Sequence, residues 1–231
     1  MVIDYNTFNE RCNALQERIA NACVICGRNP GSVKILAVTK TYSVEAALHA
    51  YKYGLWGAGE NRIQESIPKI EACSKPIRWE LIGHLQSNKA KLAVSHFDRI
   101  QSVDSDKLLS RIDACAQAEG KIMPVLLQVN AGEDPAKHGV SLEEAPRLLE
   151  EALGLEAVQV EGVMTIAPLS GSESVAERTF ERLRMLRDDL ESQFHYKLPE
   201  LSMGMSGDFE AAIRAGSTLI RVGSMLYGQR S

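Results

Sequence analysis

The chain has 231 residues, of which 26 are Lys or Arg and 30 are Asp or Glu, so its net charge is −4 at pH 7. Apolar residues make up 45% and charged residues 24%, an ordinary globular composition that excludes disordered, collagen-like and coiled-coil classes. No apolar run approaches the roughly 18–20 residues that span a bilayer. The polar segment 1–10 lacks the features of a signal or transit peptide, and the mild acidity argues against nucleic-acid binding. We therefore expect one cytoplasmic domain over residues 1–231, with no membrane or nucleic-acid partner.

The first predicted element is an amphipathic helix. It is expected to begin at Thr7, which has the capping-box spacing with Glu10, and to end at Gly27. Apolar residues recur along it every three or four positions, as one stripe of a helix requires: Phe8, Cys12, Leu15, Ile19, Ala22 and Cys26.

This helix contains a C-x-x-C pair, Cys23 and Cys26, with the spacing of redox or zinc sites. No second cysteine pair and no paired histidines accompany it, and the total of 5 cysteines is odd. We therefore predict free, largely buried thiols in a reducing compartment, with Cys26 on the buried helical stripe and Cys23 at its margin.

Beyond Gly27 the sequence alternates between short apolar runs rich in β-branched residues and amphipathic segments. Strands are predicted at 33–39, 55–58, 78–83, 99–103, 124–129, 158–166, 200–203 and 218–224. Helices are predicted between Ser43 and Gly54, at 62–72, 87–95 and 105–119, after a cap at Ser141, and at 174–194 and 209–215.

Strands that are each separated by a helix are typical of a parallel sheet with crossover helices. Eight repeats favour closure into a single (β/α)8 (TIM) barrel over an open doubly wound sheet, because the sequence lacks a pair of glycine-rich phosphate fingerprints. Only seven residues follow Ser224, too few for a full eighth outer helix, so the N-terminal helix is expected to cover that gap.

Polar and glycine-rich segments interrupt the pattern where the predicted strands end. The loops at this face carry the chemistry of such barrels, so we expect the functional site there. The interruptions are Lys40, Gly59–Asn61, Gly83–Lys89, Asp104, Asn130, Thr165, Ser206–Gly207 and Arg221–Ser224.

Lys40 ends the first predicted strand. Alternation along the strand puts Leu36, Val38 and Lys40 on one face. If that face points into the barrel, the Lys40 amine lies at the end of an apolar interior. Desolvation lowers the pKa of a lysine, and a neutral amine attacks a carbonyl to form an imine. The alternative is a structural lysine whose side chain extends to water.

The loops after the seventh and eighth strands have the composition of a phosphate site. Ser206 and Gly207 precede a short helix, Gly223 allows close approach of the backbone, and Ser224 offers an amide and a hydroxyl. Taken singly, each is equally consistent with a turn glycine or a capping serine.

Arg221 interrupts the last apolar strand, where an unpaired guanidinium is costly. It suits either a buried ion pair with Glu60 or Asp208, or a lone pair on a bound ring nitrogen, because arginine always donates and never accepts. An imine-forming lysine, a phosphate site and a ring-nitrogen donor together indicate pyridoxal 5′-phosphate (PLP) as the cofactor.

Several segments are specific in both sequence and order: Ala37–Thr41, Gly59–Asn61, Ile82–Lys89, Gly162–Ile166, Leu201–Ser206 and Gly216–Ser224. At these residues the chain resembles the pyridoxal phosphate homeostasis protein family nearly from end to end. That family is similar to the barrel domain of bacterial alanine racemase standing alone.

The resemblance implies a role for each candidate residue. Lys40 would carry the PLP imine, Arg221 would face the pyridine nitrogen, and Asn61 would lie beside the cofactor. The remaining residues would hold the phosphate: Ser206, Gly223 and Ser224.

Two departures from the family pattern are visible. The family commonly has an aromatic residue where this chain has Ala58, and often His-Phe where this chain has Glu80 and Leu81. The first is expected to loosen packing beside the cofactor. Neither departure touches the lysine or the phosphate loops.

The resemblance implies a protein that holds PLP for vitamin B6 homeostasis, buffering it or delivering it to apo PLP-dependent enzymes, rather than an enzyme. The chain ends at Ser231, soon after the eighth strand, so we expect no second domain of the alanine racemase kind, an open site and a monomer. An arginine against the ring nitrogen also disfavours its protonation, which weakens the ring as an electron sink.

Two alternatives stay open. One is a weak PLP-dependent amino-acid racemase that uses Tyr42 or His84 as a second acid–base group. The other is a class I aldolase-type barrel in which Lys40 forms an imine with a sugar phosphate.

Overall fold

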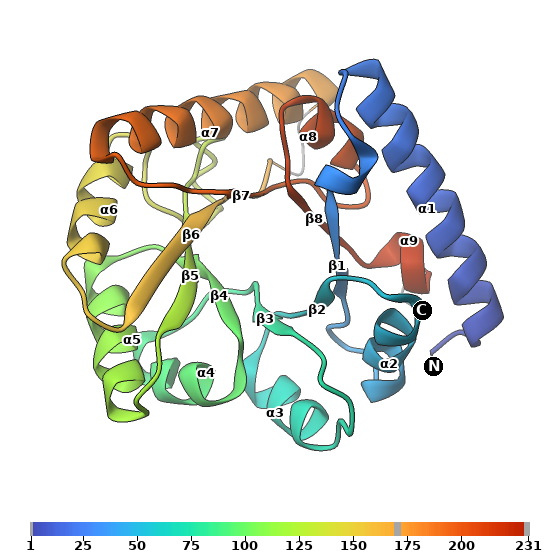
Figure 1. The fold of residues 1–231 in the computed structure, drawn as a ribbon, viewed down its shortest axis with the longest axis horizontal. Helices are drawn as coiled ribbons and strands as arrows, with labels where there is room; N and C mark the ends of the chain where they lie inside the picture. The colour runs from blue at the N-terminus through green and yellow to red at the C-terminus, as the bar shows by residue number, and fades with distance from the viewer. Residues whose placement is uncertain (1, 169–171, 229–231) are drawn as a thin grey trace.

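Eight parallel strands close into a barrel in the computed structural model, which describes residues 2–168 and 172–228 (Figure 1). They pair in chain order, and the last strand returns to the first. The strands are β1 (Lys34–Val38), β2 (Gly57–Glu60), β3 (Trp79–Leu81), β4 (Arg99–Val103), β5 (Met123–Gln128), β6 (Val158–Met164), β7 (Glu200–Ser202) and β8 (Leu219–Val222). The predicted (β/α)8 barrel is confirmed. The prediction that residues 1–231 form a single domain stays a prediction, because this range includes residues outside the described ones.

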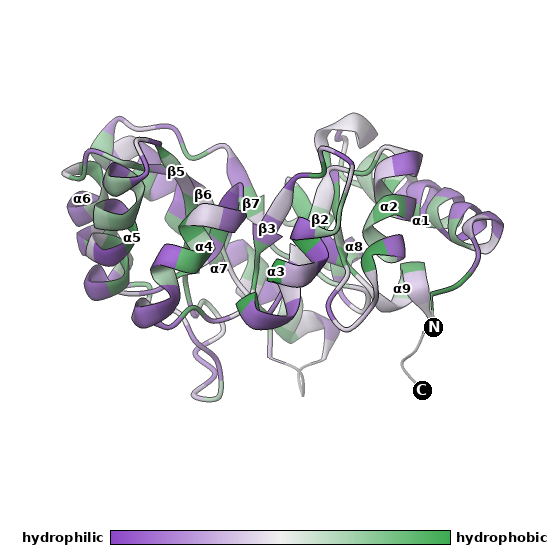
Figure 2. Ribbon diagram, turned by 90° about the horizontal axis from the view of Figure 1, so that it is seen from below, coloured by the Kyte–Doolittle hydropathy of each residue, from purple (hydrophilic) through white to green (hydrophobic). Residues whose placement is uncertain are grey.

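Helices surround the strands (Figure 1). They are α1 (Tyr5–Ile25), α2 (Val44–Tyr53), α3 (Ile63–Glu71), α4 (Ala90–His96), α5 (Asp106–Ala118), α6 (Ala145–Leu153), α7 (Glu173–Phe194), α8 (Phe209–Arg214) and α9 (Ser224–Tyr227), with 3-10 turns at η1 (Pro30–Ser32) and η2 (Ser87–Lys89). In Figure 2 the outer helices α4, α5 and α6 carry both hydrophilic and hydrophobic residues, as helices with one buried face do. Within the described ranges, no helix has the length and apolar character needed to cross a membrane.

The N-terminal helix covers the seam where β1 meets β8, as predicted (Figure 1). Phe8, Leu15 and Ile19 of α1 are buried in one cluster with Ile35 of β1 and Ile220 of β8. Burying a side chain of this kind contributes about 1.5–3 kcal/mol. Helix α1 is therefore part of the barrel rather than an appendage.

The first helix differs from its prediction at both ends. Asp4, not Thr7, is the cap, because its carboxylate accepts a hydrogen bond from the Thr7 amide at 3.1 Å. The helix ends before Cys26, so Cys26 is only partly buried while Cys23 is fully buried, the reverse of the predicted order. The cysteines are free thiols, as expected.

The strands begin and end within two residues of their predicted bounds, and two of the differences have a visible local cause. The strand predicted at 55–58 lies at 57–60, because Leu55 donates its amide to the Ala50 carbonyl at 3.0 Å in the turn that ends α2. The last strand stops at Val222 rather than at Ser224, because Ser224 is the first residue of the short helix α9.

A buried ion network joins strands from opposite sides of the barrel. Arg99 is 1% exposed, and its guanidinium pairs with Glu80 (3.0 Å), Glu161 (2.9 Å) and Glu200 (2.9 Å). Burial alone raises the pKa of the Glu200 carboxyl, but the positive charges of Arg99 and Lys34 outweigh burial and hold that pKa below its ordinary value. The network therefore stabilises the charged form of the Glu200 carboxylate.

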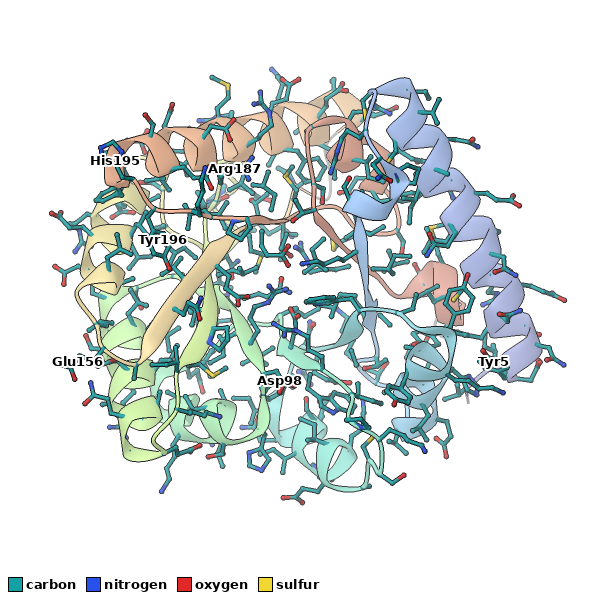
Figure 3. The ribbon with its side chains drawn as sticks, viewed as in Figure 1. Tyr5, Asp98, Glu156, Arg187, His195 and Tyr196 are labelled. Atoms are coloured by element: carbon teal, nitrogen blue, oxygen red, sulfur yellow. The ribbon has the colours of Figure 1, made fainter. Side chains whose placement is uncertain are left out.

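The loop after α7 ties this helix to the strands at the same end. His195, the residue that ends the helix, has a left-handed backbone conformation with a φ of 50°. Tyr196 then lies near β6 (Figure 3), and its hydroxyl donates to the Val160 carbonyl at 3.0 Å. Arg187 of the helix donates to the Leu198 carbonyl at 3.3 Å. These contacts hold the start of β7 beside β6.

Replacing Arg99 with Met is expected to lower the free energy of unfolding at pH 7 by about 3–5 kcal/mol, because buried carboxylates lose their counter-charge. The lowered pKa of Glu200 gives stability that is full above the carboxyl's unfolded pKa and is lost as the pH falls through the folded one. Urea unfolding followed by circular dichroism should therefore show the gap between wild type and variant shrinking as the pH falls below about 4.3.

Arg147→Met is the matched control, because it removes an exposed ion pair with Asp106. Its cost should not exceed about 1 kcal/mol. Equal losses of stability for Arg99→Met and Arg147→Met would contradict the role given to the buried network.

Candidate functional site

A cavity of about 500 Å³, here called the Lys40 cavity, opens where β1, β7 and β8 end. Small-molecule pockets are commonly about 300–1,000 Å³, so the cavity has room for a small organic cofactor. The structure brings most of the predicted site residues together in its lining: Lys40, Ser206, Arg221, Gly223 and Ser224. The other lining residues are Val38, Tyr42, Met205, Gly207 and Gly228.

Lys40 reaches the cavity from the end of β1. Val38, two residues earlier, also lines it, which agrees with the predicted alternation along the strand. Directly after Lys40 the chain turns, and Thr41 has φ 68, a left-handed conformation that β-branched residues rarely adopt. Such strain persists only where the surrounding structure imposes it, and it clusters at functional sites.

A buried hydrogen-bond and ion-pair network holds Thr39, the residue directly before Lys40. The Thr39 hydroxyl donates to the Glu60 carboxylate at 2.6 Å, and the same carboxylate pairs with the ammonium of Lys69 from α3. Lys69 also donates to the Thr39 carbonyl at 2.9 Å. The side chains of Lys69 and Glu60 are 9% and 1% exposed, so this ion pair is shielded from water. Sequence analysis did not identify Lys69, because no local spacing connects it with Thr39.

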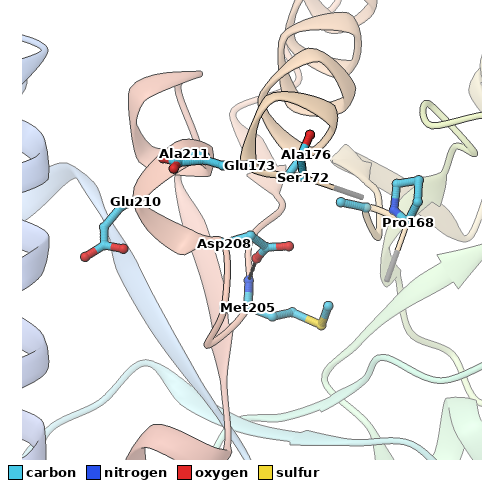
Figure 4. A pocket seen from close by; sticks show the side chains of 10 residues that line it. Pro168, Ser172, Glu173, Ala176, Met205, Asp208, Glu210 and Ala211 are labelled. Atoms are coloured by element: carbon cyan, nitrogen blue, oxygen red, sulfur yellow. Dashed lines mark hydrogen bonds between the residues drawn. The ribbon is translucent and has the colours of Figure 1, made fainter. Parts of the chain in front are cut away.

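One acidic side chain shapes the loop after β7. The Asp208 carboxylate accepts the Met205 amide at 2.6 Å, which closes the turn that presents Ser206 (Figure 4). Burial raises the pKa of this carboxyl. Gly204 has φ 94, and a Cβ there would lie 2.5 Å from a side chain of α8. Only glycine allows this approach of the loop to the helix.

A smaller cavity of about 350 Å³ adjoins the first, and Met205 and Gly207 line both. Figure 4 shows its walls from α7, α8 and the β7 loop. Its charged lining residues are the acidic Glu173, Asp208 and Glu210. An anionic group is therefore favoured in the Lys40 cavity rather than here.

The end of β8 lies directly against the end of β1. A Cβ on Gly223 would lie 3.3 Å from both the Cβ and the carbonyl oxygen of Val38. Ser224 follows as the exposed first residue of α9. Amides at the start of a helix have no partner within it, which makes Gly223 and Ser224 suitable anion donors.

Arg221 is held by neutral oxygens rather than by a carboxylate. One terminal nitrogen donates to the carbonyl and the hydroxyl of Ser202, both at 2.7 Å, and the other donates to the Thr165 carbonyl at 2.7 Å. Burial lowers the pKa of Arg221 to about 10, so the guanidinium is still charged at neutral pH. Among the described residues neither Glu60 nor Asp208 forms a hydrogen bond or a close ion pair with it, although the negative charge of Asp208 acts on the guanidinium and raises its pKa against the effect of burial.

Other residues singled out in the sequence lie elsewhere. Asn61 is not among the described residues that line the Lys40 cavity, so its place beside a cofactor stays a prediction. Gly83 approaches Asn61 so closely that a Cβ would lie 2.2 Å from its carbonyl oxygen. His84 is also outside the lining. Ala58 is fully buried in the core cluster, so its position does not support the expected loosening beside the cofactor.

Known proteins match the chain along nearly its whole length. The family model described as alanine racemase, N-terminal domain, matches residues 11–231. The chain is 39% identical to the pyridoxal phosphate homeostasis protein of Aquifex aeolicus, over 96% of this chain and 97% of that one.

Solved structures agree with the architecture. PipY of Synechococcus elongatus, solved with PLP bound, is 37% identical and matches 96% of this chain and 100% of its own with a TM-score of 0.85. An alanine racemase of Clostridium difficile has a TM-score of 0.79 at 17% identity. This chain covers 57% of that racemase, and the likeness shows the fold alone.

Replacing Lys69 with Met is expected to lower the free energy of unfolding by about 3–5 kcal/mol, because Glu60 would stay buried without its counter-charge. The double variant Glu60→Gln, Lys69→Met should recover much of that loss, since it removes both charges. Urea unfolding of both variants provides the measurement.

Lys197→Met is the control, because it alters an 89% exposed lysine. It should change the free energy of unfolding by no more than about 1 kcal/mol. A double variant no more stable than Lys69→Met would argue against the ion pair.

Proposed function

Since the chain belongs to the pyridoxal phosphate homeostasis protein family, with the barrel of the alanine racemase N-terminal domain, we propose that it binds PLP in the Lys40 cavity and holds it for buffering or delivery. The observation that carries the proposal is that an amine, a charged guanidinium and two small-residue loops converge on one cavity. PipY, the related protein solved with PLP bound, supports the same cofactor.

The lining fits the groups of PLP. When bound, this cofactor supplies an aldehyde that condenses with an amine, and a ring that withdraws electrons. Lys40 is the lysine in the lining and would provide the amine for a Schiff base link. Ser206 with the amides of Gly223 and Ser224 would hold the phosphate, as three small residues that leave room for its oxygens.

Arg221 favours retention of PLP over turnover. Its guanidinium stays charged at neutral pH, and the Ser202 and Thr165 oxygens fix its direction. A charged donor facing a ring nitrogen disfavours a proton on that nitrogen, and an unprotonated ring is a poorer electron sink. The residue therefore binds the ring while limiting its reactivity.

A weak racemase is the second candidate function, and one observation favours it. Tyr42 lines the Lys40 cavity, and its hydroxyl donates to the Gly228 carbonyl at 3.3 Å. A phenol in this position offers a second acid–base group on the same cavity as the amine. His84, the other residue considered for this role, is not in the lining.

Lys40→Ala is expected to abolish the visible absorbance of protein-bound PLP, because no amine remains for the covalent link. Titration with PLP monitored by absorbance is the measurement, and borohydride reduction with mass spectrometry identifies the compound attached to wild type. Lys107→Ala, which alters an exposed lysine on α5, is the control and should keep full absorbance. Full absorbance in Lys40→Ala would contradict the assignment, and a sugar phosphate on Lys40 would favour the aldolase alternative.

If the protein delivers PLP, holoprotein mixed with an apo-transaminase should restore transaminase activity faster than spontaneous release of PLP into solution would allow. In parallel, holoprotein incubated with L-alanine in D2O should show no steady exchange of the α-proton. Steady exchange that is lost in both Lys40→Ala and Tyr42→Phe would establish the racemase instead. Size-exclusion chromatography tests the accompanying prediction of a monomer.

A further inference from the structure

Two histidines and one aspartate gather at the mouth of the barrel, away from the lining of the Lys40 cavity. His84 follows β3, Asp104 follows β4, and His138 lies on the loop between β5 and α6. One ligand atom from each lies within 4.8 Å of the others. We propose that these residues, here called the histidine cluster, form a binding site for a divalent transition-metal ion.

The strands hold the backbone of the cluster in place. The Ser102 hydroxyl donates to the Gly83 carbonyl at 2.6 Å, directly before His84. The Gln128 side chain donates to the His138 carbonyl at 3.0 Å. Both imidazoles therefore project from a fixed backbone, while their exposed rings remain able to rotate toward a ligand.

The charges of the cluster favour a cation. The Asp104 side chain is only 14% exposed, and its basic neighbour among the described residues is His84, with Nδ1 at 3.6 Å from the carboxylate. That separation is too long for a hydrogen bond. A largely buried carboxylate without a close counter-ion is costly, and a bound cation would remove that cost.

The two imidazole rings of the cluster lie against each other. The His84 and His138 ring centroids are 4.0 Å apart with an interplanar angle of 11°. The lone pair of an imidazole nitrogen lies in the plane of its ring, so both rings must turn out of the parallel stack to direct their nitrogens at one ion. The stacking therefore keeps the two imidazoles side by side, and their exposure leaves room for them to turn.

The donor set selects the class of metal. Two imidazole nitrogens and one carboxylate oxygen suit zinc, nickel, cobalt or copper, whereas magnesium and calcium prefer oxygen ligands throughout. Ligands at about 2.0–2.2 Å from a tetrahedral ion lie roughly 3.4 Å from one another. Rotation of the imidazoles and of the Asp104 carboxylate would have to bring the three ligand atoms from within 4.8 Å of one another to that spacing, with the fourth tetrahedral position left for another ligand.

Titration calorimetry with Ni²⁺ tests the site on the full chain without a histidine tag and with thiols blocked. Wild type should bind one Ni²⁺ per chain, and His138→Ala and Asp104→Asn should each weaken binding roughly ten-fold or more. The matched control is His96→Ala, because His96 has Glu71 as a carboxylate partner at 3.6 Å and belongs to no three-ligand cluster within the described residues. It should bind like wild type, and Mg²⁺ should not bind.

Unchanged Ni²⁺ affinity in both His138→Ala and Asp104→Asn would overturn the proposal, as would equal weakening in His96→Ala. Circular dichroism and PLP titration of the same variants show that the fold and the Lys40 cavity persist. Because the cluster does not line that cavity, loss of nickel with PLP binding retained supports a separate site. Loss of both in these variants would indicate a structural role and count against it.

Discussion

The pairing of β1 with β8 is the constraint on which the site depends. Parallel hydrogen bonds join the first and last strands in a register that sets Leu36 opposite Arg221. Since parallel strands present their carboxyl ends on one face, closure of the barrel brings Lys40 beside the loop of Gly223. The approach is close enough that a side chain on Gly223 would press on β1. Helix α1 covers this seam with apolar side chains, so the packing of the N-terminal helix and the geometry of the cavity are linked.

Two buried arginines, Arg99 and Arg221, have different partners and therefore different roles. Arg99 is surrounded by carboxylates, and its charge is neutralised within the network that joins opposite strands. The hydrogen-bond partners of Arg221 in the described part of the chain are hydroxyl and carbonyl oxygens, which fix its direction, while the charge of Asp208 acts on it without a hydrogen bond. A neutralised cation stabilises the fold, whereas an oriented cation at a cavity wall is available to a ligand.

The Lys40 cavity and the histidine cluster lie over different strands at the mouth of the barrel. The Lys40 cavity lies over β1, β7 and β8, and the histidine cluster lies over β3, β4 and the loop after β5. Each set of side chains is carried by its own strands and loops. We therefore expect that one site can be altered by mutation while the barrel and the other site remain.

The sequence by itself determined the alternation of strands and helices, the barrel, and the residues that end its strands. The alternation follows from local periodicity, which also places Lys40 at a strand end and Arg221 within a strand, whereas Ser206 is predicted from the composition of its loop and from the family resemblance. Only the tertiary structure decided which of these residues share a cavity. It also revealed the partners of Glu60 and Arg221, because such contacts join residues far apart in the chain. The periodicity of hydrophobic residues shows which face of a strand a side chain occupies. Which residue it contacts depends on the register between strands and on side-chain rotamers.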